Sequence, residues 1–167
     1  MEQVYIALGS NLGDKEKNLE AAIGKVAEKC VVVNRSSIYE TAPWGYLEQD
    51  SFLNMVLEVR SELAPRELLA FLKKAELDLG RVPNFRNGPR VIDMDILFYG
   101  NLCMDEPDLV IPHPRMQERA FVLVPLVEIA PDLQHPATQQ RVDQYLVGLD
   151  LGGIMLYKKT RNDQNGD

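Results

Sequence analysis

Short apolar runs rich in β-branched residues recur along the first hundred residues of the chain. Each run has the length of a strand and is bounded by segments that contain glycine, proline or charged residues. We therefore expect four strands, at residues 4–8, 31–40, 52–59 and 91–99.

Two segments between these runs carry apolar residues at helical spacing. The first follows a predicted N-cap at Asp14, and its apolar stripe continues to Cys30, which we interpret as a buried small hydrophobe. The second begins near Pro65, which suits a first helical turn, and stops at Gly80. Its expected buried stripe consists of Leu68, Leu72, Ala75 and Leu79. The order βαββαβ is typical of an α+β, ferredoxin-like fold, an antiparallel sheet with both helices on one face.

Residues after 100 add C-terminal elements to this core. A loop leads to Pro112-His113-Pro114, and a short helix is predicted at about residues 119–129. We expect a single domain over residues 1–160 and a disordered polar tail at 161–167. Because both core helices cover the same face of the sheet, something must occupy the opposite face.

The composition is that of an average globular protein, and it excludes several functions. The chain has 167 residues, of which 46% are hydrophobic and 26% charged. Its net charge of −7 argues against a nucleic-acid partner, which would need a basic face. The sequence shows no secretory signal, no apolar run long enough for a membrane, and too few cysteines for a disulfide scaffold. We therefore expect a cytoplasmic protein that makes no membrane contact and is a monomer.

The last predicted strand carries two carboxylates within an apolar run. Asp93 and Asp95 are two residues apart, so their side chains share one face of the strand at a separation of roughly 7 Å. The residues that alternate with them and would face the core are Ile92, Met94, Ile96 and Phe98. At an effective dielectric constant near 20, charges at this separation repel by about 2–3 kcal/mol. A bound cation would remove this repulsion, and two carboxylates suit Mg²⁺, which takes its other ligands from water and phosphate.

Arginines precede this pair in a chain that is otherwise acidic. The segment 81–92 contains Arg81, Arg86 and Arg90 but no acidic residue. Guanidinium groups bind phosphate oxygens in a bidentate manner. A solvated charged loop is the alternative, but the adjacent Asp pair favours phosphate binding.

Three further residues are candidates for ligand binding. Alternation in the strand 52–59 places Phe52 and Asn54 opposite the apolar face, where a ring and a carboxamide could hold a flat heterocycle by stacking and hydrogen bonding. A surface Phe beside a solvated Asn is the alternative, and for this pair alone it is the more common case. His113, fixed between two prolines, could donate to a phosphate, act as a general acid, or serve as a packing or capping residue.

Several motifs, in the same order along the chain, resemble those of one enzyme family. The motifs are Gly9-Ser10-Asn11-Leu12-Gly13, Phe52-Leu53-Asn54, Gly88-Pro89-Arg90 followed by Asp93-Met94-Asp95, Ile111-Pro112-His113-Pro114, and Arg119-Ala120-Phe121 followed by Glu128-Ile129-Ala130-Pro131. Together they span residues 4 to about 135. On these motifs the sequence resembles the 6-hydroxymethyl-7,8-dihydropterin pyrophosphokinases of folate biosynthesis.

The resemblance implies an ATP-dependent diphosphokinase. Such an enzyme transfers the terminal diphosphate of ATP to the hydroxymethyl group of a reduced pterin alcohol and releases AMP. Two Mg²⁺ ions would be held by Asp93 and Asp95, and catalysis would also use Arg81 and Arg90. The implied ATP-binding residues are Arg81, Arg86, Arg90, His113 and Arg119. The implied pterin-binding residues are Thr41, Pro43, Phe52, Asn54 and Phe121.

The sequence also departs from the family pattern. Asn87 stands where family members commonly have a tryptophan, and Phe52 stands where a tyrosine is frequent. Two other functional classes therefore stay open. One is a different Mg-nucleotide transferase on a ferredoxin-like sheet, which would release pyrophosphate. The other is a non-catalytic regulatory module that binds a small ligand.

Overall fold

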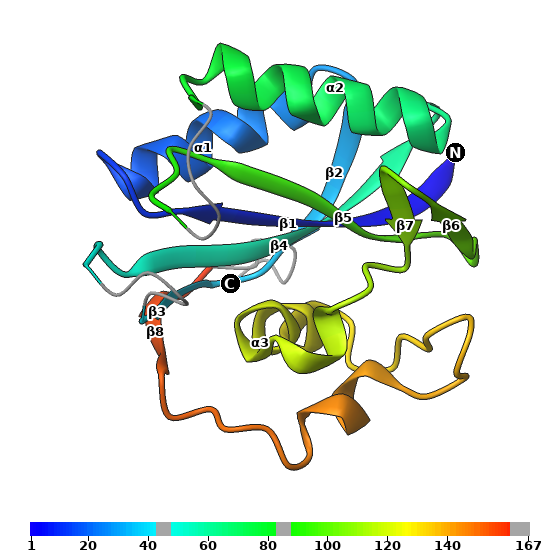
Figure 1. The fold of residues 1–167 in the computed structure, drawn as a ribbon. Helices are drawn as coiled ribbons and strands as arrows, with labels where there is room; N and C mark the ends of the chain where they lie inside the picture. The colour runs from blue at the N-terminus through cyan, green and yellow to red at the C-terminus, as the bar shows by residue number, and fades with distance from the viewer. Residues whose placement is uncertain (43–47, 83–87, 161–167) are drawn as a thin grey trace, which may run out of the picture.

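The computed structural model describes residues 1–42, 48–82 and 88–160, and in this part of the chain a central antiparallel sheet lies between two helical layers (Figure 1). The helices are α1 (Lys15–Val26), α2 (Pro65–Asp78) and α3 (Ala120–Ile129). The strands of the large sheet are β1 (Glu2–Ser10), β2 (Cys30–Arg35), β3 (Ile38–Thr41), β4 (Phe52–Ser61), β5 (Asp93–Tyr99) and β8 (Ile154–Lys158). Helices α1 and α2 cover one face and α3 lies on the other, which confirms the predicted α+β, ferredoxin-like class with added C-terminal elements.

The smaller elements lie between β5 and β8 in the sequence. A short hairpin is formed by β6 (Met104–Glu106) and β7 (Leu109–Ile111), and two 3₁₀ helices span Met116–Glu118 and Val142–Leu146. No helix in the described ranges is both long and apolar enough to span a bilayer. The predicted tail at 161–167 lies outside the described residues.

The strand order in the large sheet is β5–β1–β4–β3–β8, and β2 also pairs with β4. The prediction of one continuous strand over residues 31–40 is wrong, because the chain breaks at Ser36 and Ser37 into β2 and β3. The buried Ser36 hydroxyl accepts the backbone N–H of Val56 at 2.9 Å and donates to the carbonyl oxygen of Ser37 at 2.8 Å. A side chain therefore replaces part of the backbone ladder at this point.

Both core helices begin and end for reasons that the sequence shows. Asp14 accepts the backbone N–H of Lys17 at 3.2 Å, as expected for an N-cap, and Pro65 occupies the first turn of α2. Gly80 follows α2 with a φ of +102°, a conformation that favours glycine. Cys30 does not continue α1 but begins β2; it shares the helical stripe because it packs in the same core.

A β-bulge in β5 changes which side chains face the helices. Tyr5 pairs with Phe98, whereas Ile6 pairs with Ile96, so Leu97 is an extra residue in the ladder. The prediction that Phe98 faces the helix-side core is therefore wrong. Phe98 instead packs edge-to-face on Tyr5 on the opposite face, with ring centroids 6.3 Å apart. Ile92, Met94 and Ile96 lie in the helix-side core as predicted.

A second apolar cluster covers the sheet face opposite α1 and α2. The sheet contributes Tyr5, Val56, Leu97 and Phe98 to this cluster, and the C-terminal elements contribute Met116, Val122, Leu126 and Val142. The C-terminal elements thus occupy part of the face that the ferredoxin-like core leaves open, for which the sequence predicted a covering without identifying it. A cavity opens beside them.

We predict that Leu72→Ala lowers the free energy of unfolding by about 2–5 kcal/mol, because Leu72 is fully buried (0% exposed) between α2 and the sheet. Leu77→Ala in the same helix is the matched control, since Leu77 is 64% exposed and its loss should change stability by less than about 0.5 kcal/mol. Urea unfolding of the two variants measures the difference. Equal losses of unfolding free energy in Leu72→Ala and Leu77→Ala would contradict the described packing of α2.

Candidate functional site

The cavity is built on three adjacent strands, with β1 in the middle. Gly9 of β1 pairs with Asn54 of β4 on one side and with Asp93 of β5 on the other. Ala7 likewise lies between Val56 and Asp95. Since paired residues in neighbouring strands share a face, this register brings the carboxamide and both carboxylates to one surface. The predicted face assignments of Asn54, Asp93 and Asp95 are therefore confirmed.

Ala7 and Gly9 line the cavity; the sequence analysis included Gly9 in a glycine-flanked motif but missed Ala7. A Cβ atom on Gly9 would lie 3.1 Å from Oδ1 of Asn54, so a larger residue at this position would press on the Asn54 side chain. The signal that could have revealed Ala7 lies in three alternate residues of β1, Tyr5, Ala7 and Gly9. They share one face of the strand, and their side chains become smaller along it. The small side chains leave this part of the sheet face open to the cavity.

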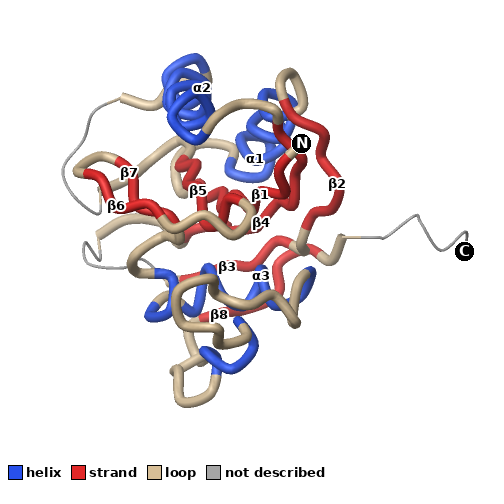
Figure 2. The backbone as a smooth tube through the Cα atoms, turned by 90° about the vertical axis from the view of Figure 1, so that its right-hand side faces the viewer, coloured by secondary structure: helices blue, strands red, loops and turns tan. Residues whose placement is uncertain are grey.

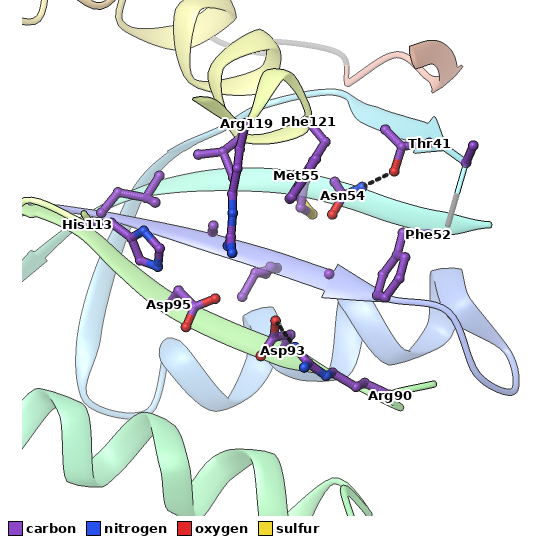
Figure 3. A pocket seen from close by; sticks show the side chains of 16 residues that line it. Thr41, Phe52, Asn54, Met55, Arg90, Asp93, Asp95, His113, Arg119 and Phe121 are labelled. Carbon is purple, nitrogen blue, oxygen red and sulfur yellow. Dashed lines mark hydrogen bonds and ion pairs between the residues drawn. The ribbon is translucent and has the colours of Figure 1, made fainter. Parts of the chain in front are cut away.

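One end of the cavity carries aromatic rings and an amide. Phe52 and Asn54 come from β4, Thr41 from the end of β3, and Phe121 from the first turn of α3 (Figure 3). The Asn54 amide donates to Oγ1 of Thr41 at 2.8 Å, and both side chains are buried. This hydrogen bond fixes the plane of the amide and leaves its Oδ1 oxygen available at the cavity wall.

The other end of the cavity is charged and is organised around Asp93. Nη1 of Arg81 lies 3.0 Å from one carboxylate oxygen of Asp93, and Nη1 of Arg90 lies 3.0 Å from the other. Arg90 lines the cavity, whereas Arg81 borders it through its ion pair with Asp93. The two predicted arginines and the predicted carboxylate thus lie together.

Glu76 of α2 supports this cluster, and the sequence reasoning missed it. Its carboxylate accepts the backbone N–H of Met94 at 2.7 Å and lies 2.8 Å from Nη1 of Arg81. Glu76 is only 3% exposed, and burial raises its pKa. The signal that could have revealed it is its spacing: Glu76 continues the i, i+4 stripe of Leu68 and Leu72, where an apolar residue would be expected.

Asn11 fixes the backbone of Arg90. Its N–H donates to the carbonyl oxygen of Arg90 at 3.0 Å, and its Oδ1 accepts the N–H of Arg90 at 2.7 Å. The Asn11 amide also donates to Gln49 and to the carbonyl oxygen of Asp50. Asn11 of this glycine-flanked motif therefore anchors the segment that carries Arg90 and leads into β5 with its two carboxylates.

Asp95 lies in the cavity without an ion-pair partner among the described residues. Burial, followed by the charge of Asp93, raises the pKa of Asp95 to about 7. The described residues contain no cluster of three or more metal-ligating side chains. A carboxylate pair without further protein ligands fits Mg²⁺, which usually binds one or two carboxylates and completes its shell with water and phosphate oxygens.

His113 lines the cavity as a neutral imidazole. Burial, together with the nearby charge of Arg119, lowers its pKa to about 4. Its Nδ1 accepts the backbone N–H of Arg115 at 3.3 Å, which leaves the hydrogen on Nε2. Of the predicted alternatives, this arrangement favours a hydrogen-bond donor over a general acid at neutral pH.

Arg119 completes the cavity at the start of α3. Its guanidinium carbon lies 5.7 Å from the ring centroid of Phe121, within the range of a cation–π contact. Burial, followed by the charge of Arg115, lowers the pKa of Arg119. A cation in this position can meet the negative charge of a ligand in the cavity.

The cavity therefore brings together most of the residues predicted from the sequence. The members that line it are Thr41, Phe52, Asn54, Arg90, Asp93, Asp95, His113, Arg119 and Phe121. Pro43 and Arg86, also predicted as binding residues, lie outside the described residues, as does Asn87.

The sequence matches the family described as 7,8-dihydro-6-hydroxymethylpterin-pyrophosphokinase (HPPK) over residues 5–131. The chain belongs to this family. The match contains every motif that carried the resemblance, and it includes both ends of the cavity.

Similar proteins come from distant organisms. The chain is 46% identical to a 2-amino-4-hydroxy-6-hydroxymethyldihydropteridine pyrophosphokinase of Methylorubrum extorquens, in a match that covers 92% of this chain and 98% of that protein. It is 47% identical to the folic acid synthesis protein FOL1 of Dictyostelium discoideum, in a match that covers 90% of this chain. The chain spans only 23% of the length of the Dictyostelium protein.

The fold is also that of solved HPPK structures. The wild-type HPPK-DHPS of Plasmodium falciparum superposes with a TM-score of 0.71, at 16% sequence identity, over 86% of this chain and 44% of that one. At this level of identity the similarity concerns the fold alone. It agrees with the α+β arrangement described above.

We predict that Asp95→Asn stabilises the ligand-free protein at high pH. The pKa of Asp95 rises from 3.8 to about 7 on folding, so burying its carboxylate costs stability as the pH rises between these values. Asn is neutral throughout, and the variant should exceed the wild type in free energy of unfolding at pH 8 by about 2–4 kcal/mol. The difference should vanish near pH 4.

Urea unfolding at pH 4, 6 and 8 in the presence of a chelator measures this effect. Asp105→Asn is the control, because Asp105 is exposed on β6. A constant difference between Asp95→Asn and the wild type at all three pH values would contradict the assignment.

Proposed function

We propose that this chain transfers a diphosphate from ATP to the hydroxymethyl group of 6-hydroxymethyl-7,8-dihydropterin, giving AMP and the pterin diphosphate. The observation that carries the proposal is that one cavity has two chemically different ends. Phe52, Phe121 and Asn54 suit a flat heterocycle, and Asp93 and Asp95 suit a metal-bound polyphosphate beside it. Membership of the HPPK family supports the same reaction.

The pterin ring would stack between Phe52 and Phe121 at the aromatic end. Asn54 would pair with the edge of the ring, because its Oδ1 is left available by the hydrogen bond from its amide to Thr41. Stacking and edge pairing together would direct the hydroxymethyl group toward the carboxylates at the other end of the cavity. Pro43, outside the described residues, stays a predicted pterin contact.

We further propose that Asp93 and Asp95 hold two Mg²⁺ ions when ATP binds. The bound metal would neutralise triphosphate charge and lower the pKa of the attacking hydroxyl group. Asp95 suits this role because it lies in the cavity with a raised pKa and no ion-pair partner among the described residues. Asp93 suits it by position, because it lies on the same face of β5 as Asp95, and because each of its carboxylate oxygens meets one guanidinium group and keeps a further lone pair.

Arg81 and Arg90 would bind phosphate oxygens while they remain beside Asp93. Each uses Nη1 on the Asp93 carboxylate and has further N–H donors for a phosphate. His113 would donate from Nε2, and Arg119 would contribute positive charge from the start of α3. Arg86, outside the described residues, stays a predicted ATP contact.

The reaction needs alignment more than covalent catalysis. The pterin hydroxyl oxygen forms a bond to the β-phosphorus of ATP, and the bond from this phosphorus to the oxygen shared with the α-phosphate breaks, so that AMP leaves. The hydroxyl proton passes to Asp95 or to solvent. The arginines stabilise the charge that moves onto the departing AMP.

The deciding experiment incubates the purified chain with ATP, Mg²⁺ and 6-hydroxymethyl-7,8-dihydropterin. We expect AMP and the pterin diphosphate in equal amounts, and no product after the metal is removed with a chelator. Release of pyrophosphate would instead indicate a nucleotidyl transferase. Ligand binding without metal dependence or turnover would indicate a regulatory module.

We predict that Asp95→Ala keeps the fold but lowers turnover by more than tenfold, because the variant loses one of the two carboxylates at the charged end. The rate of AMP formation measures the effect, and circular dichroism checks the fold. Asp105→Ala, which removes an exposed carboxylate on β6, should leave the rate unchanged. A variant that keeps more than about a tenth of the rate would show that the metal assignment is wrong.

We predict that Arg90→Ala lowers kcat for diphosphate transfer by about tenfold or more and weakens pterin binding much less. The reason is that Arg90 lies at the charged end, on Asp93. Steady-state kinetics with each substrate varied in turn separates the two effects. Arg60→Ala on β4 is the control, since Arg60 is exposed and does not line the cavity. Equal losses in kcat and in pterin affinity would argue against a phosphate role for Arg90.

A further inference from the structure

Helix α3 carries Phe121 at one end and Glu128 at the other, seven residues apart. Seven residues make about two helical turns, so both side chains lie on the same side of the helix, about 10 Å apart along its axis. Between them, Val122 and Leu126 are buried in the second apolar cluster. The position of Phe121 over the cavity therefore depends on how the whole helix sits on the sheet.

The carboxylate of Glu128 is held by three hydrogen bonds at β3. Its Oε1 accepts the backbone N–H of Ser37 at 3.0 Å and the hydroxyl of Tyr39 at 2.7 Å, and its Oε2 accepts the hydroxyl of Ser37 at 2.8 Å. The Ser37 hydroxyl oxygen itself accepts the N–H of Thr160 at 3.0 Å, so its own proton is directed to Glu128. All three partners donate, and an ionised carboxylate, which only accepts, matches them.

The same run of alternate residues connects this anchor with the cavity. Tyr39 and Thr41 share one face of β3, and Ser37 stands just before the strand, two residues from Tyr39. Ser37 and Tyr39 hold Glu128, and Thr41 accepts the hydrogen bond from Asn54 in the cavity wall. Figure 2 shows α3 beside β3, and α3 lies on the side of the sheet away from α1 and α2.

These hydrogen bonds are the directional part of the attachment of α3. Apolar packing at Val122 and Leu126 is non-directional and permits small rotations and shifts. Within the described ranges, no other side chain of α3 donates or accepts a hydrogen bond to the sheet. Glu128 thus fixes the rotation of α3 about its own axis and its position relative to β3.

We propose that Glu128 is a positioning residue that sets the spacing between Phe121 and Phe52, and so the width of the slot for the flat ligand. The inference rests on the proposed function for the identity of that ligand, a pterin. It assigns a role to a motif residue that lies outside the cavity and touches neither substrate.

The test compares Glu128→Gln, Glu128→Asp and the control Glu20→Gln. Gln presents an N–H₂ group to donors, and Asp keeps the charge but shortens the reach by about 1.5 Å. We expect both Glu128 variants to raise KM for the pterin by about tenfold and KM for ATP by a clearly smaller factor, because α3 also carries Arg119 at its N-terminus. Glu20→Gln removes a carboxylate that pairs with Arg35 near α1 and should change neither constant.

A second measurement makes the outcome independent of turnover. Hydrogen exchange at the first-turn amides of α3 should accelerate in Glu128→Gln but not in Glu20→Gln, with or without substrates. If Glu128→Gln does not fold, Tyr39→Phe is the substitute, because it removes one of the three hydrogen bonds to Glu128. It should raise KM for the pterin and accelerate exchange in α3 by smaller factors.

The proposal is overturned if folded Glu128→Gln leaves KM for the pterin unchanged, or if it raises both KM values equally. Wild-type behaviour of Glu128→Asp would also overturn it, because charge alone would then be sufficient. If the wild type forms no pterin diphosphate, the proposed function fails, and unchanged exchange at α3 in Glu128→Gln would separately disprove the anchor.

Discussion

Two carboxylates on one face of β5 need positive charge beside them, and the charged half of the site is arranged to meet this need. Arg81 and Arg90 both pair with Asp93. Glu76, buried under the sheet, holds Arg81, while Asn11 fixes the backbone of Arg90. Asp95 receives no such partner in the described part of the chain, and its raised pKa expresses the remaining cost of burial. A divalent cation would complete the charge balance at the place where the protein leaves it incomplete.

The central strand β1 joins this charged half to the aromatic half. Because β1 pairs with β4 on one side and β5 on the other, Gly9 lies between Asn54 and Asp93. Because Gly9 has no side chain, there is room for the Asn54 amide. The aromatic end and the charged end of the cavity therefore lie on one continuous sheet surface. The bulge at Leu97 then turns Phe98 to the same face, where it supports the C-terminal elements that complete the wall. Register alone therefore brings residues that are distant in sequence to one surface.

How far the sequence could predict this arrangement depended on the range of the interactions. The strands, the helices and the shared face of Asp93 and Asp95 follow from local periodicity, which needs no knowledge of partners. Phe98 was misplaced because a bulge is a property of the pairing of two strands. Glu76 was missed because a carboxylate is acceptable in an apolar stripe only when a distant arginine and a backbone N–H meet it. The break at Ser36 likewise depended on Val56, twenty residues away.

The two halves of the cavity are supported by different parts of the chain. The ferredoxin-like core holds the charged end through α2, β5 and the turn at Asn11. The aromatic end depends on α3, a C-terminal addition that Glu128 fastens to the beginning of β3. Among the described residues, the contacts around Asp93 and those around Glu128 have no residue in common, and perturbations without shared partners are usually additive. Affinity for the flat ligand and alignment of the phosphates can therefore be tuned separately, except through Arg119, which begins α3 and lines the same cavity.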